Sequence, residues 1–503
     1  MANPLYDGLF GLHAGKSTAF LQLPDGQVIT HQGFLEISAQ IAHVMVEIGL
    51  KPGDRVAVQV EKSAQALALY AACAQAGLVF LPLNTAYTVD ELSYFIENSG
   101  ASLIVCDGSN ADELTGVANG LKAKIETLNS DGSGSLIARA STMATHFATV
   151  DRQGDDLAAF LYTSGTTGRS KGAMLTQNNL LSNAQTLVRE WRFTSDDVLL
   201  HALPIFHTHG LFVATNVTLV AGGSMIFLPK FDLDQVVAHL PAATTMMGVP
   251  TFYTRLLGDA RFTKKLTAHM RLFVSGSAPL LAETHVQFEE RSGHRILERY
   301  GMTETNMNTS NPYFGERRAG TVGFPLPGVE VKICDAEGRA LPQGEIGEIE
   351  VRGPNVFKGY WQMSEKTAAE LRENGFFITG DLGRIDQDGY VQIVGRNKDL
   401  IISGGYNIYP KEIELVLDDQ PGVLESAVIG VPHPDFGETV LGVIVAERGA
   451  TPDADAILKA VSQTLARFKH PRRLVLLEEL PRNTMGKVQK NILRDQYQGM
   501  FTS

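Results

Sequence analysis

Short apolar runs of strand length alternate with amphipathic helical segments through most of the chain. Two such runs are Arg55–Gln59 and Leu103–Cys106, and the segment between them, residues 88–98, has the spacing of a helix. Thr88, followed three residues later by Glu91, forms a capping-box pattern at the start of that helix. Alternating strands and helices predict an α/β protein whose parallel sheets are covered by helices.

The longest apolar stretch, residues 66–83, is interrupted by Gln75, Gly77 and Pro82. A membrane-spanning helix needs about 20 predominantly apolar residues in a row. The stretch therefore predicts a buried helix that stops at Gly77, followed by a short strand, and no membrane span.

The pattern changes after about residue 395 and predicts a separate C-terminal domain. Pro410 begins a helix whose apolar face contains Ile413, Val416 and Leu417. Strands at 427–431 and 441–446, a helix at 454–465 and a strand at 473–477 follow. We expect an N-terminal domain over residues 1–395, a hinge at 396–398 and a C-terminal domain over 399–503.

Composition excludes some classes of partner. With 503 residues, the chain is long enough for roughly three folding units. Its net charge of −12 predicts no binding to nucleic acid and no attraction to an anionic membrane. The three cysteines have no metal or disulfide spacing, and the N-terminus has no signal-peptide pattern, so we expect buried thiols and a cytoplasmic location.

Residues 162–172 read Tyr-Thr-Ser-Gly-Thr-Thr-Gly-Arg-Ser-Lys-Gly and follow an apolar strand. Glycines let backbone N–H groups approach anionic oxygens, and hydroxyl groups add donors, so the composition favours a loop that wraps phosphate. A solvated Ser/Gly loop has the same composition and remains the alternative at this point. The candidate phosphate-binding residues are Thr163, Ser164, Gly165, Thr166, Thr167, Gly168 and Lys171.

Four further segments carry candidate chemistry in a fixed order. Glu304, in the segment 300–304, offers a carboxylate for Mg²⁺. Asp381, in the segment 379–383, offers one for the hydroxyls of a ribose. Lys398 lies at the predicted domain boundary, in the segment 395–399. Lys487, in the segment 481–487, offers a point charge on a long stem that could offset charge in a phosphoryl transition state.

Together these five segments resemble, in order and spacing, the signature motifs of the adenylate-forming superfamily of acyl-CoA synthetases, adenylation domains and luciferases. The resemblance covers essentially the whole chain. It implies a large N-terminal domain of layered αβαβα sheets plus a distorted β-barrel, and a small mobile α+β C-terminal domain. It implies ATP, Mg²⁺ and coenzyme A as cofactor and co-substrates.

The resemblance also assigns roles to residues. Lys487, Glu304, Thr163 and His207 are implied as catalytic, Glu304 and Thr303 as metal-binding, and Lys398 as the hinge. The implied nucleotide and coenzyme A contacts, besides the 163–171 loop, are Ser277, Ala278, Tyr300, Gly301, Thr303, Asp381, Arg396, Gly404 and Gly405.

The acid substrate is indicated by residues 246–257, where Arg255 follows Phe252 at helical spacing. A guanidinium offers a bidentate fork to a second carboxylate, although an arginine with its stem along the surface fits the same pattern. Together with residues 203–210 and 302–308, the segment resembles malonyl-CoA synthetases. That resemblance implies malonate, with methylmalonate as a second acid, and contacts from Arg255, His207, Ser277 and Met302.

Other interpretations remain open at this stage. His207 and His209 are two residues apart and would share a strand face, as two ligands of a zinc ion do. No third ligand lies nearby in the sequence, so we do not expect zinc there. A ligase for another short or medium-chain acid, an enzyme that loads a carrier protein, and an inactive nucleotide-binding sensor would each carry similar motifs. Family precedent also suggests a lysine acetyltransferase that acts on Lys487.

Overall fold

The computed structural model describes residues 2–163, 170–403, 406–434, 436–465, 467–483 and 486–501. The chain forms two compact units. Unit 1 comprises Met1–Glu330 and Val351–Phe377, and unit 2 comprises Val331–Glu350 and Ile378–Ser503. The sequence-based boundary at residue 395 stays a prediction.

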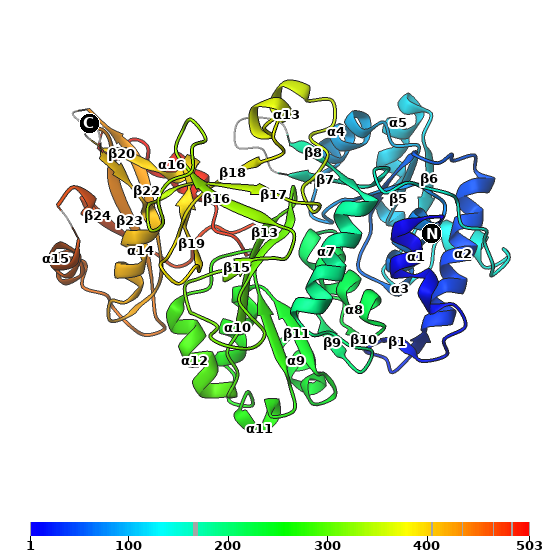
Figure 1. The fold of residues 1–503 in the computed structure, drawn as a ribbon, viewed down its shortest axis with the longest axis horizontal. Helices are drawn as coiled ribbons and strands as arrows, with labels where there is room; N and C mark the ends of the chain where they lie inside the picture. Colours follow the sequence, from blue (N-terminus) through cyan, green and yellow to red (C-terminus); the bar gives the residue numbers. More distant parts are fainter. Residues whose placement is uncertain are drawn as a thin grey trace. The chain divides into compact units, whose positions relative to one another are not determined.

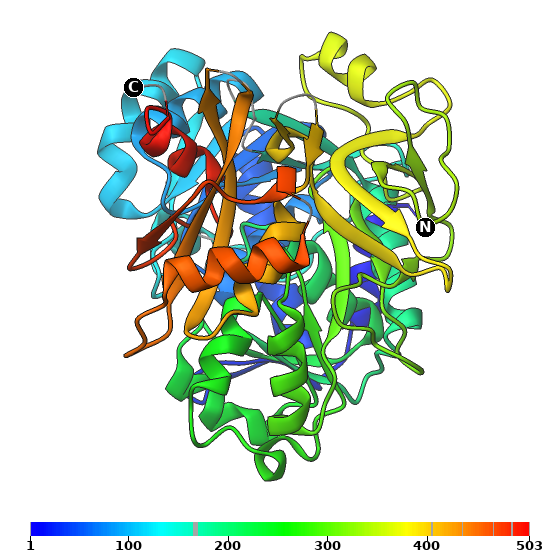
Figure 2. The same cartoon turned by 90° about the vertical axis from the view of Figure 1, so that its left-hand side faces the viewer.

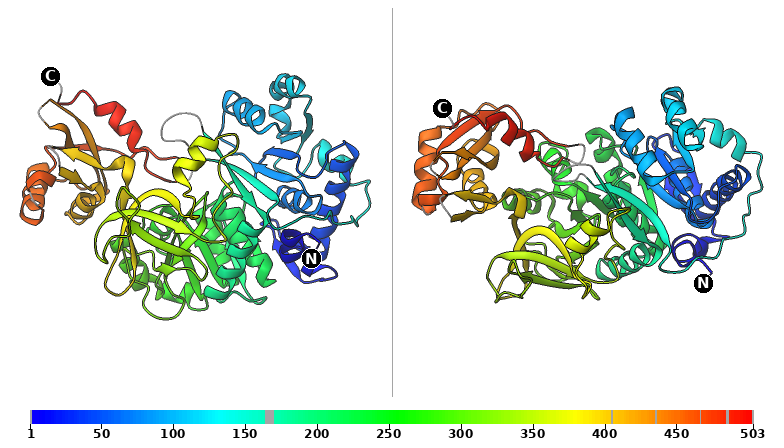
Figure 3. Two further views of the ribbon diagram at one scale, coloured as in Figure 1. Left: turned by 45° about the horizontal axis from the view of Figure 1, so that its top comes forward. Right: turned by 90° about the horizontal axis from the view of Figure 1, so that it is seen from above.

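The first half of unit 1 is built on a six-stranded sheet in the order β6-β5-β3-β4-β7-β8 (Figure 1). Its strands are β3 (Arg55–Gln59), β4 (Val79–Pro82), β5 (Leu103–Cys106), β6 (Lys124–Thr127), β7 (Leu157–Thr163) and β8 (Lys171–Thr176). All neighbours are parallel except β7 and β8, which form an antiparallel pair. Figure 3 shows this layer and its helices, coloured blue to cyan, from two further directions.

The helices of this half confirm several sequence predictions. They are α1 (Pro4–Leu9), α2 (His31–Glu47), α3 (Ala64–Gln75), α4 (Val89–Ser99), α5 (Ala111–Leu121) and α6 (Ser135–Ala140). Both hydrogen bonds of the predicted capping box form at the start of α4. The apolar run at 66–83 is divided, as predicted, between the buried helix α3 and the strand β4.

The second half of unit 1 contains a nine-stranded sheet in the order β15-β14-β13-β12-β11-β9-β10-β1-β2. Its strands are β1 (Ala19–Gln22), β2 (Val28–Thr30), β9 (Val198–His201), β10 (Ser224–Phe227), β11 (Thr245–Gly248), β12 (Leu272–Ser275), β13 (Leu297–Met302), β14 (Asn306–Ser310) and β15 (Phe324–Pro325). The strands from β1 through β13 in this order are parallel to their neighbours, and the pairs at both edges are antiparallel. The carboxyl ends of β11, β12 and β13 therefore meet at one edge, where ligands bind in sheets of this kind.

The described residues of unit 1 form further helices after β8. They are α7 (Gln177–Glu190), α8 (Asn216–Ala221), α9 (Leu233–His239), α10 (Pro250–Leu257), α11 (Lys264–Thr267), α12 (Ala282–Ser292) and α13 (Ser364–Glu370). One buried cluster joins three of these helices to the sheet. It contains Val236 of α9, Leu256 of α10 and Phe288 of α12, together with strand residues such as Phe273. In Figure 1, α7 runs through the middle of unit 1 beside α8.

Unit 2 contains two sheets. The four-stranded sheet has the order β16-β17-β18-β19 and consists of β16 (Glu330–Cys334), β17 (Gly347–Arg352), β18 (Phe377–Ile385) and β19 (Val391–Arg396). The five-stranded sheet consists of β20 (Ile401–Ser403), β21 (Tyr406–Ile408), β22 (Val423–His433), β23 (Gly437–Ala446) and β24 (Arg473–Leu477).

Three helices cover the two faces of this five-stranded sheet (Figure 2). They are α14 (Pro410–Asp418), α15 (Ala454–Thr464) and α16 (Lys490–Tyr497). Ile413 of α14 and Val461 of α15 share a core with one face, whereas Leu493 of α16 packs with residues of the other face.

The α/β class is confirmed, with a large N-terminal region of sheets and helices and a small C-terminal domain. All three cysteines are buried free thiols, as predicted. No helix in the described part of the chain has the length and apolar character that a membrane span requires.

Candidate active site

The predicted phosphate loop joins two paired strands of unit 1. Thr163 ends β7 and Lys171 begins β8, and the two residues stand opposite each other in the antiparallel register. The Thr163 hydroxyl lies 3.5 Å from the carbonyl oxygen of Lys171. Ser164, Gly165, Thr166, Thr167 and Gly168 lie outside the described residues.

Lys171 points into a cluster of polar side chains that the sequence did not indicate. Its Nζ lies 3.2 Å from the Tyr360 hydroxyl and 3.3 Å from a carboxylate oxygen of Glu370 in α13. The Tyr360 hydroxyl lies 2.7 Å from Glu370 and 3.0 Å from the buried carboxylate of Glu304. The structure thus joins Lys171 to Glu304 through Tyr360.

Glu304 lies in the tight turn between β13 and β14. The turn depends on Gly301, since a Cβ atom there would stand 1.9 Å from the carbonyl oxygen of Asn306, and Asn306 itself has a φ of 49°. Thr303 is half-buried in the same turn.

Two buried asparagines brace this hairpin. Asn183 of α7 bonds to both the N–H and the C=O of Met307, and Asn355 donates to the carbonyl oxygen of Thr305. Such bonds fix the Glu304 turn against the helix α7 behind it.

Burial dominates the electrostatics of Glu304. Loss of solvent raises the pKa of its carboxyl, and nearby Glu370 raises it further, while Lys171 and the bond from Tyr360 oppose the rise. A desolvated carboxylate of this kind suits a divalent cation. No cluster of three or more His, Cys, Asp or Glu side chains forms a metal cage among the described residues. Mg²⁺ is commonly held by one or two carboxylates together with substrate phosphates and water, and Glu304 is the carboxylate expected to hold it.

The other end of the site contains a buried cation that the sequence analysis missed. Arg299 of β13 is 4% exposed, and its Nε and Nη2 atoms have no hydrogen-bond partner among the described residues. No carboxylate of the described chain lies within ion-pair distance of its guanidinium. Burial lowers the pKa of Arg299 to about 9, which leaves the group charged at neutral pH.

A neutral histidine accompanies this cation. His209 is 1% exposed, its Nδ1 lies 3.2 Å from the Ser277 hydroxyl, and its Nε2 has no described partner. Burial and the neighbouring charge of Arg299 hold the pKa of His209 well below its ordinary value. An anion bound here would contact the charged guanidinium of Arg299 and the neutral imidazole of His209, both of them shielded from solvent.

The backbone at residues 276–278 shapes the same corner. A Cβ atom on Gly276 would stand 2.3 Å from Cζ of Arg299, so the absence of a side chain lets the guanidinium lie against this loop. Ser277 has a φ of 72°, a left-handed conformation that is strained for a serine, and Ala278 beside it is half-buried.

One sequence-based expectation differs from the structure, and another stays a prediction. Arg255 is exposed on α10, with its guanidinium 5.9 Å from the ring centroid of Phe231, and its contact with the acid stays a prediction. His207 and His209 do not share a strand face, because His209 begins a π-helix, His209–Thr215. His207 is half-buried, and its Nδ1 accepts a hydrogen bond from the backbone N–H of His209 at 3.3 Å.

The expected acid contact Met302 and the expected nucleotide contact Tyr300 lie at the carboxyl end of β13, directly after Arg299. A signal for Arg299 was present in the sequence. Residues 296–300 read Ile-Leu-Glu-Arg-Tyr, which places two charges inside an apolar strand that leads into the Glu304 motif.

Unit 2 holds the remaining candidates in a cluster of its own. Asp381 of β18 and Arg396 of β19 are register partners, joined by an ion pair of 3.1 Å. Burial and then the charge of Arg396 lower the pKa of Lys487 to about 8, and Lys398 adds to the effect. Gly404 and Gly405 lie outside the described residues.

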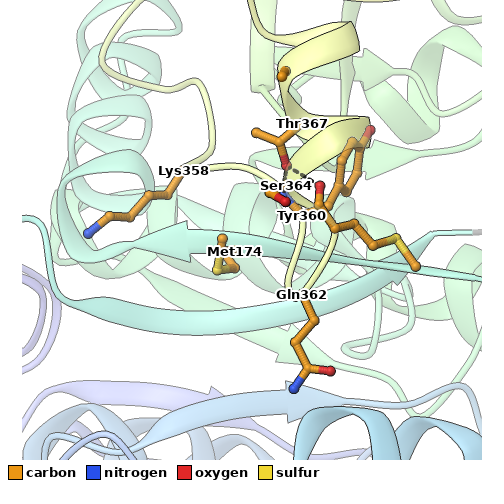
Figure 4. Close-up of a pocket in the computed structure, with 8 residues that line it drawn as sticks. Met174, Lys358, Tyr360, Gln362, Ser364 and Thr367 are labelled. Carbon is orange, nitrogen blue, oxygen red and sulfur yellow. Dashed lines mark hydrogen bonds between the residues drawn. The ribbon is translucent and has the colours of Figure 1, made fainter.

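An open groove of about 500 Å³ lies beside α13 in unit 1, and Figure 4 shows its lining. Met174, Lys358, Gln362 and Ser364 face it, and the Thr367 hydroxyl accepts from the backbone N–H of Tyr360 at 2.9 Å. Tyr360, which contacts Glu304 and Lys171, also lines this groove, whereas Glu304 and Arg299 do not.

Comparisons with known proteins identify the family of this chain and a closely similar solved structure. The family model described as AMP-binding enzyme matches residues 13–361, and the model of the AMP-binding enzyme C-terminal domain matches residues 412–487. The crystal structure of ATP-bound MatB from Rhodopseudomonas palustris is 57% identical, covers 100% of both chains and superposes with a TM-score of 0.98.

Two curated relatives show how far the acid varies at lower identity. A malonate–CoA ligase of Arabidopsis thaliana is 36% identical, over 95% of this chain and 84% of the relative. A feruloyl-CoA synthase of an Amycolatopsis species is 35% identical, over 94% of each. Identity at this level is therefore similar for relatives named for different acids.

Proposed function

Since this chain belongs to the AMP-binding enzyme family, we propose that it is an ATP-dependent malonate–CoA ligase that releases pyrophosphate and AMP. One observation carries the choice of acid: Arg299, a buried guanidinium with unpartnered nitrogen atoms, lies beside the neutral His209. Burying an unpaired charge is costly, so such a group needs an anionic ligand. A fatty or aromatic acid would offer it only an apolar tail.

The proposed first step is adenylation. One carboxylate of malonate attacks the α-phosphorus of ATP, an O–P bond forms, and the bond to the leaving pyrophosphate breaks. Arg299 holds the second carboxylate, with His209 and Ser277 beside it. This arrangement orients the short acid, because malonate has only one carbon between its two carboxylates.

Charge at the phosphates is offset by side chains of the family motifs. Lys171 and the Thr163 loop bind phosphate oxygens, and Glu304, with Thr303, would hold Mg²⁺. When bound, Mg²⁺ neutralises charge on the triphosphate. Lys487 stabilises the charge that builds up between the carboxylate and the phosphate.

The proposed second step is transfer to coenzyme A. The thiol sulfur attacks the acyl carbonyl and loses its proton, a C–S bond forms, and AMP leaves with the oxygen that linked it to the acyl group. From the resemblance, we propose that the C-terminal domain turns about Lys398 between the steps and that Gly404 and Gly405 then accommodate the pantetheine arm. A cytoplasmic location and acetylation of Lys487 stay predictions.

Pyrophosphate release tests the assignment. Malonate, methylmalonate, acetate, succinate and octanoate would be compared with ATP, Mg²⁺ and coenzyme A. A site that pairs a buried cation with the second carboxylate should favour malonate over acetate by on the order of 10⁴ in kcat/KM. Preference for acetate or octanoate would overturn the malonate assignment and leave the acyl-CoA ligase assignment in place.

A further inference from the structure

A buried lysine, Lys62, lies in unit 1 without an acidic partner among the described residues, and burial lowers the pKa of its amine well below the ordinary value. It is 8% exposed, and its Nζ lies 2.8 Å from both the Nδ1 and the carbonyl oxygen of His201. The same Nζ stands 4.2 Å from the ring centroid of Phe227. No described carboxylate lies within ion-pair distance of it. Because a buried amine without a counter-ion is unfavourable, stability alone does not explain this lysine.

The contact with Lys62 determines the proton position on His201. An amine that donates to Nδ1 requires an unprotonated Nδ1, so the ring proton belongs on Nε2. His201 Nε2 lies 2.9 Å from the carbonyl oxygen of Gly210, which it can reach only as a donor. Burial, and then the charge of Lys62, holds the pKa of His201 well below its ordinary value, which keeps the ring neutral.

Gly210 lies in the first turn of the π-helix His209–Thr215. Its carbonyl oxygen also accepts from the Thr215 hydroxyl at 2.9 Å. A Cβ atom at Gly210 would stand 2.0 Å from the carbonyl oxygen of Pro204, so the backbone is packed tightly on its other side. Single π-helical turns are frequent at functional sites, and this one presents His209.

We propose that Lys62 is a positioning residue for the acid site, which holds His209 beside Arg299 through the His201 ring and the Gly210 carbonyl. The inference rests on the proposed function, because it concerns how this site recognises a dicarboxylate. Lys62 does not touch the acid itself. Its effect is to fix one tautomer of His201 and, with it, the start of the π-helix.

The test is Lys62→Met in the full-length protein, which keeps the length of the side chain and removes the donor. KM for malonate should rise about 10- to 100-fold, because small misplacements of a binding group are costly. KM for ATP should stay within about threefold of the wild type, since the contacts of Lys62 among the described residues are with His201 and Phe227 and not with Thr163 or Lys171. An unchanged KM for malonate would overturn the proposal, as would an equal rise in both values.

Thr267→Val supplies a matched control. Thr267 is fully buried in the same unit and donates to the carbonyl oxygen of Ser292 at 2.9 Å, so this variant also loses one buried hydrogen bond. Its KM for malonate should match the wild type even if its melting temperature falls. If KM for malonate rose similarly in Thr267→Val, the effect of Lys62→Met would be explained by general destabilisation, and the proposal would be overturned.

A spectroscopic measurement keeps the proposal falsifiable if Lys62→Met folds poorly. Nitrogen-15 NMR of selectively labelled histidines in the wild type should show a neutral His201 protonated on Nε2 alone. Protonation on Nδ1 would overturn the proposal. The failure of the proposed function itself is distinguishable, because a wild type without preference for malonate over acetate refutes that function whatever Lys62 does.

Discussion

The hydroxyl of Tyr360 lies between two carboxylates, 3.0 Å from that of Glu304 and 2.7 Å from that of Glu370. This bond lowers the pKa of Glu304, whereas burial raises it. Tyr360→Phe should therefore raise the pKa of Glu304 further. Because a protonated Glu304 cannot hold a cation, adenylation is lost as the pH falls, and in the variant this loss should begin at higher pH.

Pyrophosphate release between pH 5 and 8 at several Mg²⁺ concentrations checks this prediction. The half-saturating Mg²⁺ concentration should rise about tenfold, the value of one hydrogen bond to a charged group. Tyr70→Phe, which loses a buried contact to Asn216 at 3.3 Å, is the control and should keep the wild-type pH profile. Equal profiles for Tyr360→Phe and wild type would contradict the role of this bond.

Arg299→Met should separate stability from function. Without malonate the variant should be more stable than the wild type by about 1–4 kcal/mol, because a buried charge without a partner is replaced by an apolar chain. Its kcat/KM for malonate should fall by about 10²–10³, since the second carboxylate loses its counter-ion. Thermal unfolding with and without malonate, together with pyrophosphate release, measures both effects.

Arg255→Met is the informative companion to this variant. Because the proposed function assigns the second carboxylate to Arg299, replacing the exposed Arg255 should change kcat/KM for malonate by less than about threefold. A large loss in Arg255→Met and a small one in Arg299→Met would return the carboxylate-binding role to the residue that the sequence suggested.

The helices and strands show what sequence patterns can and cannot predict. Local signals were sufficient for α4, whose capping box forms as expected, and for β24, whose bounds of 473–477 match the structure. Strand β22 is longer than the predicted 427–431, because its antiparallel pairing with β23 continues through the polar His433. Pairing, unlike the apolar run, is not a local property.

The site required tertiary information for similar reasons. Arg299, Gly276 and His209 come from three segments that meet only once the sheet forms, and helical spacing alone could not show that Arg255 faces solvent. The π-helix that carries His209 has no sequence signature, and its Gly210 carbonyl oxygen contacts the His201 ring of strand β9, nine residues away along the chain. The motifs could indicate candidates for the nucleotide end of the site, because there the candidate residues lie within short contiguous segments, and these roles stay predictions.

Gly276→Ala tests the close approach of the backbone to Arg299. The added Cβ would stand 2.3 Å from Cζ, and the neighbour that must move is the end of a flexible side chain. We expect a folded protein in which KM for malonate rises about tenfold while KM for ATP changes little. Gly258→Ala is the control, since its Cβ would have an ordinary contact of 3.5 Å with the carbonyl oxygen of Arg255. A folded Gly276→Ala with an unchanged KM for malonate would show that the guanidinium does not depend on this contact.

The last prediction concerns Lys487 and compares the two half-reactions. With a pKa of about 8, the Lys487 amine loses its proton as the pH rises through that value, so adenylation should fall about tenfold per pH unit above it. Thioester formation from preformed malonyl-AMP should instead increase with pH, because more of the coenzyme A thiol is ionised. Lys487→Ala should abolish the first half-reaction and spare the second. Lys487→Arg, if active, should lack the alkaline loss, because a guanidinium stays charged. Equal losses of both half-reactions in Lys487→Ala would refute the assignment of this lysine to adenylation.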